Sequence, residues 1–284
     1  MLKYFVIIIA LGFIYESLSW IFRLIRVYFC VKKERRDYKG SDLISQKVYI
    51  LIPVLAEEDI IEDTAKYFNT YFLMGREDTF LVFITTEKEN IILNQQNTIH
   101  LVSKLSKQNQ KIIHSHFSKK EGKMAHQLNY AIKELTQKLN YIKDGDLIAI
   151  YNADSRPEKE TLDWVRRKFN EGNTNVFQQY GCYYENILQI SGLSWKSTLM
   201  SASLWQTRWA LGFEIYNALK QFKFNRKKEI TKFNYPFNYC IGHGLFITPE
   251  IFRKVGGFSE NTHNEDAVLG LQLSDMQECI MPVP

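Results

Sequence analysis

Short apolar runs alternate with amphipathic stretches along most of the chain from residue 48 onward. Four runs are short and end at turn-forming or polar residues, which predicts buried strands at Val48–Pro53, Phe80–Ile84, Lys111–His116 and Leu147–Tyr151. Stretches with helical spacing follow these runs, at 57–71, 91–108, 122–139 and 159–170. Alternating strands and helices predict an α/β fold with a doubly wound, mostly parallel sheet flanked by helices.

The first 30 residues follow a different pattern. Tyr4–Phe22 is an apolar run interrupted by Glu16 and two serines. A helix over this run would be roughly 28 Å long, close to the thickness of the hydrocarbon core of a bilayer. A cleaved signal peptide is the alternative, but the run is long for one and no small-residue cleavage site follows. We therefore expect a membrane helix with an interfacial segment over residues 1–30.

Basic residues dominate the segment after the apolar run. We interpret residues 31–47 as a basic linker, because lysine and arginine outnumber acidic residues between positions 32 and 39. The bias of positive charge toward the cytoplasm predicts one N-terminal span of the cytoplasmic membrane, with everything after residue 30 on the cytoplasmic side. A solvated charge run on a soluble protein is the alternative. Residues 48–284 then form one large domain.

Composition limits the classes of function. A hydrophobic content of 45% and a charged content of 24% exclude a wholly disordered chain. A net charge of +5 is too small to indicate a nucleic-acid partner. No two of the four cysteines form a CxxC pair, so neither a zinc site nor a disulfide framework is indicated. Glycine-rich dinucleotide and P-loop motifs are both absent.

Two oxygen-bearing side chains follow the fourth predicted strand. Ligands bind parallel sheets at the carboxyl ends of the strands, which here are Pro53–Glu58, Thr85–Glu89, Phe117–Lys123 and Asn152–Arg156. Asn152 and Asp154 can point at one hard cation such as Mg²⁺ or Mn²⁺, which needs few protein oxygens when phosphates supply the rest. An ordinary turn accounts for the same two residues.

Other polar residues are weaker candidates. The adjacent Glu265 and Asp266 begin a predicted helix, where an acid acts either as a general base or only as a helix cap. His243 lies between two glycines that allow close approach of a ligand, and Lys123 lies where a phosphate would meet a helix start. The helical stretch 194–222 carries three tryptophans, which favours core packing or a membrane-facing surface over an acceptor groove.

Taken in chain order, these segments resemble the family 2 glycosyltransferases of the GT-A fold, especially membrane-bound bacterial members. The first strand and the loop after it are similar to the family's IPxxNE-type loop, and a GK…LNxA helix and a strand ending in DAD[ST] have counterparts here. The family's acceptor-side stretch, which ends in an ED motif, has a counterpart in this chain as well. The matching segments are Val48–Glu58, Gly122–Ile132, Asp146–Pro157, Gly242–Pro249, Gly256–Phe258 and Asn264–Leu271.

The resemblance implies a hexosyltransferase-type enzyme. It implies inverting transfer from a nucleotide sugar, weakly favouring a UDP-sugar, to a hydroxyl of a glycan or lipid-linked acceptor in surface polysaccharide or glycolipid synthesis. By the same resemblance Asp154 would hold a divalent cation, Mg²⁺ or Mn²⁺, with Asn152 beside it. His243, which its flanking glycines single out, is a further candidate metal ligand. Asp266 would take the proton from the acceptor hydroxyl, and Glu265 would position Asp266 or the acceptor.

The resemblance also assigns the donor contacts. Pro53 and Glu57 belong to the first donor-binding loop, and Glu57 would flank the nucleotide base and ribose together with Thr86 and Glu87. Lys123 would approach the base or a phosphate.

The chain departs from the family pattern in three places. The family usually has aspartate where Asn152 stands, acidic residues at the end of the second strand, where Thr85 stands, and often asparagine at the position of Ala56. These departures motivate an alternative function, a catalytically inactive sugar-nucleotide-binding subunit of a glycan-synthesis complex. A metal-dependent nucleotidyltransferase is disfavoured by the missing phosphate loop. The chain stops shortly after Asp266, from which we expect a naturally short or truncated form.

Overall fold

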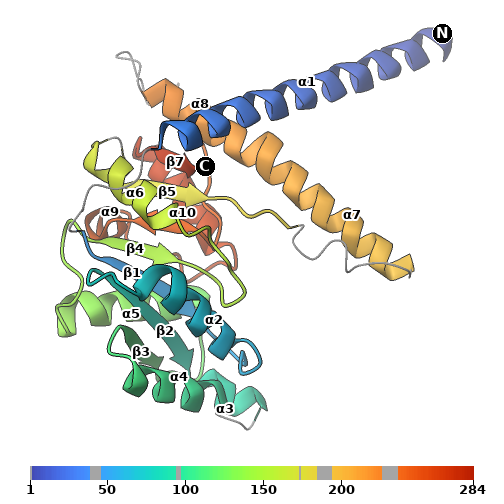
Figure 1. Cartoon of the computed structure of the whole chain (residues 1–284). Coiled ribbons are helices and arrows are strands. Elements are labelled where there is room, and N and C mark those ends of the chain that lie inside the picture. The colour runs from blue at the N-terminus through green and yellow to red at the C-terminus, as the bar shows by residue number, and fades with distance from the viewer. Residues whose placement is uncertain (1, 39–45, 94–96, 173, 184–193, 226–235) are drawn as a thin grey trace.

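The computed structural model describes residues 2–38, 46–93, 97–172, 174–183, 194–225 and 236–284. Within these ranges one sheet of seven strands runs through the domain, in the order β3-β2-β1-β4-β6-β5-β7 (Figure 1). Its strands are β1 (Val48–Pro53), β2 (Thr79–Thr86), β3 (Ile112–Phe117), β4 (Leu147–Ile150), β5 (Val176–Gln179), β6 (Leu245–Ile247) and β7 (Ile280–Val283).

The sheet has a parallel half and a mixed half. β3, β2, β1 and β4 are parallel neighbours, so their carboxyl ends meet at one edge of the sheet. β6 runs antiparallel to both β4 and β5, whereas β7 is parallel to β5. The predicted α/β class with a mostly parallel sheet is therefore confirmed, with one antiparallel strand inside the sheet.

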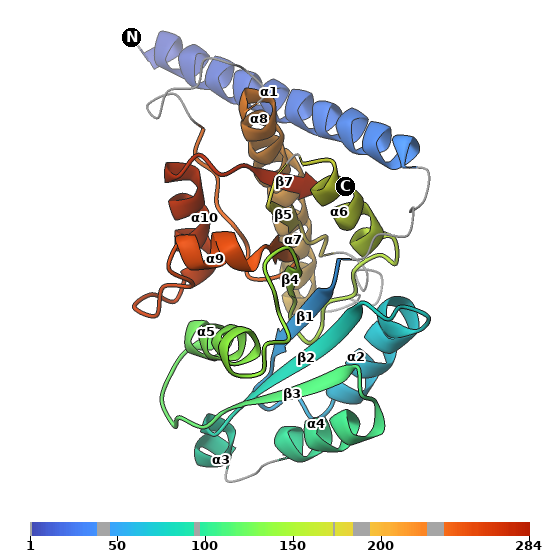
Figure 2. The same cartoon turned by 90° about the vertical axis from the view of Figure 1, so that its left-hand side faces the viewer.

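Helices cover both faces of the sheet (Figure 2). α2 and α4 lie on one face of the parallel half, and α5 lies on the other. Between residues 61 and 170 the helices are α2 (Ile61–Phe68), α3 (Lys88–Leu93), α4 (Asn97–Gln108), α5 (Met124–Lys133) and α6 (Thr161–Asn170). Further along the chain lie α7 (Ser194–Trp209), α8 (Ile215–Asn225), α9 (Pro249–Lys254) and α10 (Glu265–Asp275). A π-helical turn, Ala210–Glu214, joins α7 to α8.

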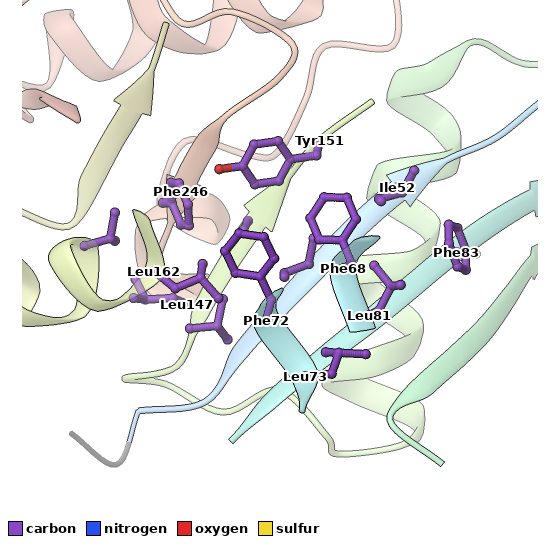
Figure 3. Packing of buried hydrophobic residues seen from close by; sticks show 14 of the residues in the cluster. Ile52, Phe68, Phe72, Leu73, Leu81, Phe83, Leu147, Tyr151, Leu162 and Phe246 are labelled. Atoms are coloured by element: carbon purple, nitrogen blue, oxygen red, sulfur yellow. The ribbon is translucent and has the colours of Figure 1, made fainter. Parts of the chain in front are cut away.

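Aromatic side chains fill the core between the sheet and α2 (Figure 3). The ring of Phe68 lies 5.5 Å from that of Phe72 and 5.8 Å from that of Tyr151, measured between centroids. Tyr151 in turn meets Phe246 of β6 edge-on at 5.9 Å. Burying each phenylalanine contributes about 2–3 kcal/mol, so this contact fixes β4 and the residues that follow it.

The N-terminal helix α1 (Leu2–Asp37) extends away from the domain (Figure 1). It is long and apolar enough to cross a membrane, and its apolar side chains before residue 20 are exposed. It contacts the domain at Trp20, which is only 8% exposed and whose indole N–H donates to Glu16 at 2.8 Å. Gly212 allows this approach, because a methyl group on Gly212 would lie 2.4 Å from the Trp20 ring.

Most predicted elements are present, with shifted ends. The four predicted strands correspond to β1 to β4, and the predicted helix 91–108 is divided between α3 and α4. The predicted helix 57–71 begins only at Ile61, after a turn. α1 continues to Asp37, so the first part of the predicted basic linker is helical. β5, β6, β7 and α9 were not predicted, because each is short and lacks a clear apolar period.

Candidate functional site

A cavity of about 370 Å³ opens at the carboxyl ends of β1 and β4. It lies where rules for parallel sheets place a ligand, at the edge where neighbouring strands end. The loop after β1, the starts of α3 and α5 and the turn after β4 line it. Five predicted site residues are part of the lining: Pro53, Glu57, Lys123, Asn152 and Asp154.

Local hydrogen bonds fix the turn after β4. Ser155 donates its backbone N–H to the carbonyl of Asn152 at 3.1 Å, and Asn152 donates its own N–H to the Ser155 hydroxyl at 3.2 Å. The guanidinium group of Arg156 donates to the backbone carbonyl of Ala153 at 3.0 Å. The turn interpretation of this segment is therefore correct, and the turn also presents the side chains of Asn152 and Asp154 to the cavity.

Asp154 has an exposed carboxylate at the cavity. No hydrogen bond or ion pair to it is found within the described ranges, so its oxygens are free for a ligand. Burial raises the pKa of Glu57, and the negative charges of Asp154 and then Glu58 raise it further. The two lining carboxyl groups therefore share one electrostatic environment, which a cation would stabilise.

Asp266 lies beside the cavity at the start of α10. A methyl group built on Gly242 would lie 3.4 Å from Oδ2 of Asp266 and 3.5 Å from Cε of Met124, which lines the cavity. Oδ1 of Asp266 accepts the backbone N–H of Ala267 at 2.7 Å, which orients the carboxylate. Asp266 and the lining residue Met124 thus both approach Gly242, which places the carboxylate beside the cavity.

Glu265 is placed differently from its neighbour. It is only 5% exposed, and burial is the main cause that raises its pKa. The negative charge of Asp266 adds to this rise, whereas the positive charge of Lys123 opposes it. Glu265 is therefore buried inside the domain, while Asp266 is half-buried.

The imidazole of His243 interacts electrostatically with Asp154 and Asp266, the two acids predicted from the sequence. Burial lowers the pKa of its imidazole, and the negative charges of Asp154 and Asp266 both oppose this change. Its backbone carbonyl accepts from Nε2 of Gln178 at 2.7 Å, and its ring meets Tyr183 edge-on at 6.3 Å. His243 is not part of the cavity lining, but acids from the turn after β4 and from the start of α10 both act electrostatically on its ring.

Thr86 and Glu87 are not among the residues that line the cavity. Thr86 is buried and its hydroxyl accepts the backbone N–H of Lys88 at 3.3 Å. Glu87 accepts from Asn90 at 3.0 Å and lies 3.4 Å from Nε2 of His116. The end of β2 instead reaches the cavity through Lys88.

Three residues of the site were not predicted. Lys88 lines the cavity and its ammonium group donates to the carbonyl of Gly122 at 3.4 Å. Gln127 lines the cavity from α5. It is a polar residue on the buried face of that helix, and this feature could have indicated its role from the sequence. Glu214 is buried in the π-helical turn after α7 and accepts from the Tyr239 hydroxyl at 2.8 Å. Burial raises the pKa of Glu214, and the charge of Asp266 adds to the rise.

A metal site made by the protein alone is not present in the described part of the chain, where no group of three or more His, Cys, Asp or Glu side chains could hold an ion. Asp154 and Asn152 are hard oxygen donors at the cavity. They fit a Mg²⁺ or Mn²⁺ ion that takes one or two protein oxygens and completes its shell with phosphate oxygens. His243 adds a nitrogen donor near Asp154, which Mn²⁺ accepts more readily than Mg²⁺.

Solved structures share this fold. The chain is similar to a mannosyltransferase from Pyrobaculum calidifontis in complex with GDP-Man and Mn²⁺, with a TM-score of 0.57, 13% identity, and coverage of 95% of this chain and 65% of that one. It is also similar to S. aureus TarS 1–349 in complex with UDP, with a TM-score of 0.54, 13% identity, and coverage of 84% and 58%. The chain therefore spans less than two thirds of either structure. No protein-family model and no curated protein sequence matches it.

The fold is that of the GT-A-type glycosyltransferases. This confirms, at the level of the fold, the resemblance to family 2 glycosyltransferases noted from the sequence motifs. The cavity at the carboxyl ends of β1 and β4 is the part of this fold where the chain gathers its chemically useful side chains.

Proposed function

We propose that the chain is a glycosyltransferase that moves a sugar from a nucleotide-sugar donor to a hydroxyl group of an acceptor. The observation that carries this proposal is that, within a GT-A fold, Asp154 lines the cavity and Asp266 lies beside it, with Oδ2 of Asp266 and Cε of the lining residue Met124 both within 3.5 Å of one point next to Gly242. Such a pair of carboxylates can serve the two ends of one transfer, a cation at the diphosphate and a proton at the acceptor.

The donor would occupy the cavity. Its diphosphate would lie near Asp154, Asn152 and a divalent cation, which stabilises the negative charge of the leaving nucleoside diphosphate. Lys88 and Lys123 would add positive charge around the phosphates. The neighbours in complex with GDP-Man and with UDP support a nucleotide-sugar donor but leave the base open, so we assign no preference beyond this class.

The acceptor would approach from the side of α10. Asp266 would accept the proton of the attacking hydroxyl while the hydroxyl oxygen bonds to the anomeric carbon and the bond to the diphosphate breaks, which inverts the configuration. Glu265 would position α10 and its neighbour Asp266 rather than meet the substrate, because it is buried.

The proposal includes a membrane location, which α1 supports. Its exposed apolar side chains and its length support a single span of the cytoplasmic membrane, with the domain on the cytoplasmic side. The acceptor would then be a glycan or a lipid-linked molecule near the bilayer, as in the synthesis of a surface polysaccharide or glycolipid.

The direct test is turnover of a panel of UDP- and GDP-sugars by the detergent-solubilised chain. Release of nucleoside diphosphate, together with transfer of sugar to membrane-extracted lipid acceptors, is measured with Mn²⁺, with Mg²⁺ and with EDTA. The proposal predicts release that depends on the cation and on the acceptor. Binding of a nucleotide sugar without release, at all acceptors and cations, would instead support a non-catalytic donor-binding subunit.

A further inference from the structure

Three arginines gather where α1 crosses the segment that joins α7 to α8. The guanidinium carbon of Arg208 lies 4.6 Å from the centre of the Trp20 ring, and that of Arg23 lies 5.5 Å from the same ring. Arg23 also lies 5.5 Å from the centre of Tyr216, and Arg26 lies 5.6 Å from it. Because neighbouring arginines share a ring, we call Arg23, Arg26 and Arg208 the arginine cluster.

The arginine cluster lacks a carboxylate partner within the ranges that the structure describes. Other arginines of the chain have one: Arg35 pairs with Glu158 at 3.0 Å and Arg253 with Asp144 at 2.6 Å. The carboxylate nearest to the cluster along α1, that of Glu16, accepts the indole N–H of Trp20.

Stacking on aromatic rings occupies the flat faces of these guanidinium groups. The N–H groups at their edges stay free for an acceptor. Three like charges that share two rings repel one another, so an anion placed between them stabilises the arrangement. A phosphate group matches this need, because guanidinium groups bind phosphate oxygens in pairs.

The surroundings of the arginine cluster are apolar. Ile21, Phe22 and Ile25 of α1 are 53%, 61% and 50% exposed, and Trp205 of α7 is 53% exposed. In the chain Ile21, Phe22 and Ile25 flank Arg23, at the end of the apolar run of α1. A cluster of cations at the end of a membrane-spanning run lies at the level of the lipid headgroups.

We propose that Arg23, Arg26 and Arg208 bind the phosphate headgroup of an anionic membrane lipid. The arginines provide the charge, and the exposed apolar side chains beside them contact the acyl chains. This combination favours a lipid over free phosphate, which has nothing to gain from apolar neighbours. The site is separate from the cavity at β1 and β4, so the proposal does not depend on the proposed enzyme activity.

The experiment measures binding to the full chain in a neutral detergent, by thermal stability during titration. The ligands are short-chain phosphatidylglycerol, phosphatidylcholine of the same chain length and inorganic phosphate. We expect stabilisation by phosphatidylglycerol at concentrations at least tenfold below those of the other two. Equal stabilisation by phosphatidylcholine would overturn the requirement for an anionic lipid, and equal stabilisation by inorganic phosphate would overturn the assignment to a lipid.

Variants locate the site. Each arginine near a lipid headgroup strengthens binding about fivefold, so R23Q/R26Q/R208Q should bind phosphatidylglycerol roughly a hundredfold more weakly. K33Q/R35Q/R36Q removes the same charge from α1 about 10 Å or more beyond Arg26, outside the screening length, and should change binding less than threefold.

The single variant R208Q tests the same claim without altering α1. Arg208 is exposed and lies in α7, so its loss leaves the sequence of α1 unchanged, and binding should weaken about fivefold. Wild-type affinity in R208Q, or an equal loss in R208Q and in the K33Q/R35Q/R36Q control, would overturn the proposed site.

Discussion

Asp154 follows β4 and Asp266 lies in the first turn of α10, yet both carboxylates act on one imidazole. Burial lowers the pKa of His243, and the negative charges of Asp154 and Asp266 oppose this lowering. β4 pairs with β6, and His243 lies just before β6, so the sheet places His243 beside the end of β4 that leads to Asp154. The predicted meeting of these two distant residues is the basis of the proposed function.

Lys88 should contribute to donor binding more than to chemistry. Lys88→Met removes a cation from the cavity lining, and loss of a charge-assisted hydrogen bond of about 1.5 kcal/mol raises KM for the donor about tenfold. Initial rates over a range of donor concentrations measure this. Lys119→Met, which removes a charge outside the cavity lining, should leave KM unchanged. A fall in kcat at constant KM would show that Lys88 has a different role.

Gly270 should be essential for the position of α10. A methyl group there would lie 2.2 Å from the backbone nitrogen of Cys240 and 2.4 Å from Cα of Tyr239. Backbone atoms cannot move aside as a flexible side chain can, so Gly270→Ala should destabilise the domain by about 3 kcal/mol. Thermal unfolding measures the loss, and activity should fall with it because Asp266 moves. The matched control is Gly12→Ala in α1, where nothing lies within 4 Å. Equal melting temperatures of the two variants would contradict the close packing.

Ala56 adopts a left-handed backbone conformation with φ of 58°. The side chain is exposed, and glycine adopts this backbone conformation without the strain that the Ala56 Cβ causes, so Ala56→Gly should stabilise the domain by roughly 0.5–1 kcal/mol. Asparagine also tolerates this conformation, which gives a physical reason for the expected asparagine at this position. Unfolding in denaturant compares the variant with Ala10→Gly in helix α1, which should be destabilised instead. A loss of stability in Ala56→Gly would contradict the strained conformation.

His243 should make stability depend on pH below neutrality. Burial lowers the pKa of its imidazole below the usual value of 6.5, so between that lower pKa and 6.5 the unfolded chain binds more protons than the folded one. Stability is therefore complete above pH 6.5 and is lost as the pH falls below it. Melting temperatures of wild type and His243→Gln at several values between pH 8 and pH 5 measure this. The variant should show a smaller loss on acidification, and an identical loss would show that other groups cause it.

Sequence patterns predicted the parallel half of the fold well. β1 and β4 are uninterrupted apolar runs, and the acids, amide and lysine that follow them or open α5 all line the cavity. The mixed half was missed because β6 and β7 are only a few residues long, and a proline lies inside β7. Strands this short depend on pairing with their neighbours rather than on their own sequence.

Some site residues were not predicted from the sequence for a similar reason. Thr86 and Glu87 were assigned to the donor because β2 ends there, but the direction of each side chain depends on neighbours such as His116. Glu214 was not assigned a role, because its electrostatic interaction with Asp266 and its hydrogen bond to Tyr239 arise only in the folded chain. Such contacts between distant segments are not encoded in local spacing.

The most direct test of the account compares turnover and donor binding in Asp154→Ala and Asp266→Asn. Asp154→Ala should lose both cation-dependent donor binding and turnover. Asp266→Asn should keep donor binding and lose about 100- to 1,000-fold in kcat, because it removes only the proton acceptor. Asp144→Asn, at the opposite end of β4, should behave like wild type. Near-normal turnover in Asp266→Asn, or unchanged donor binding in Asp154→Ala, would contradict the account.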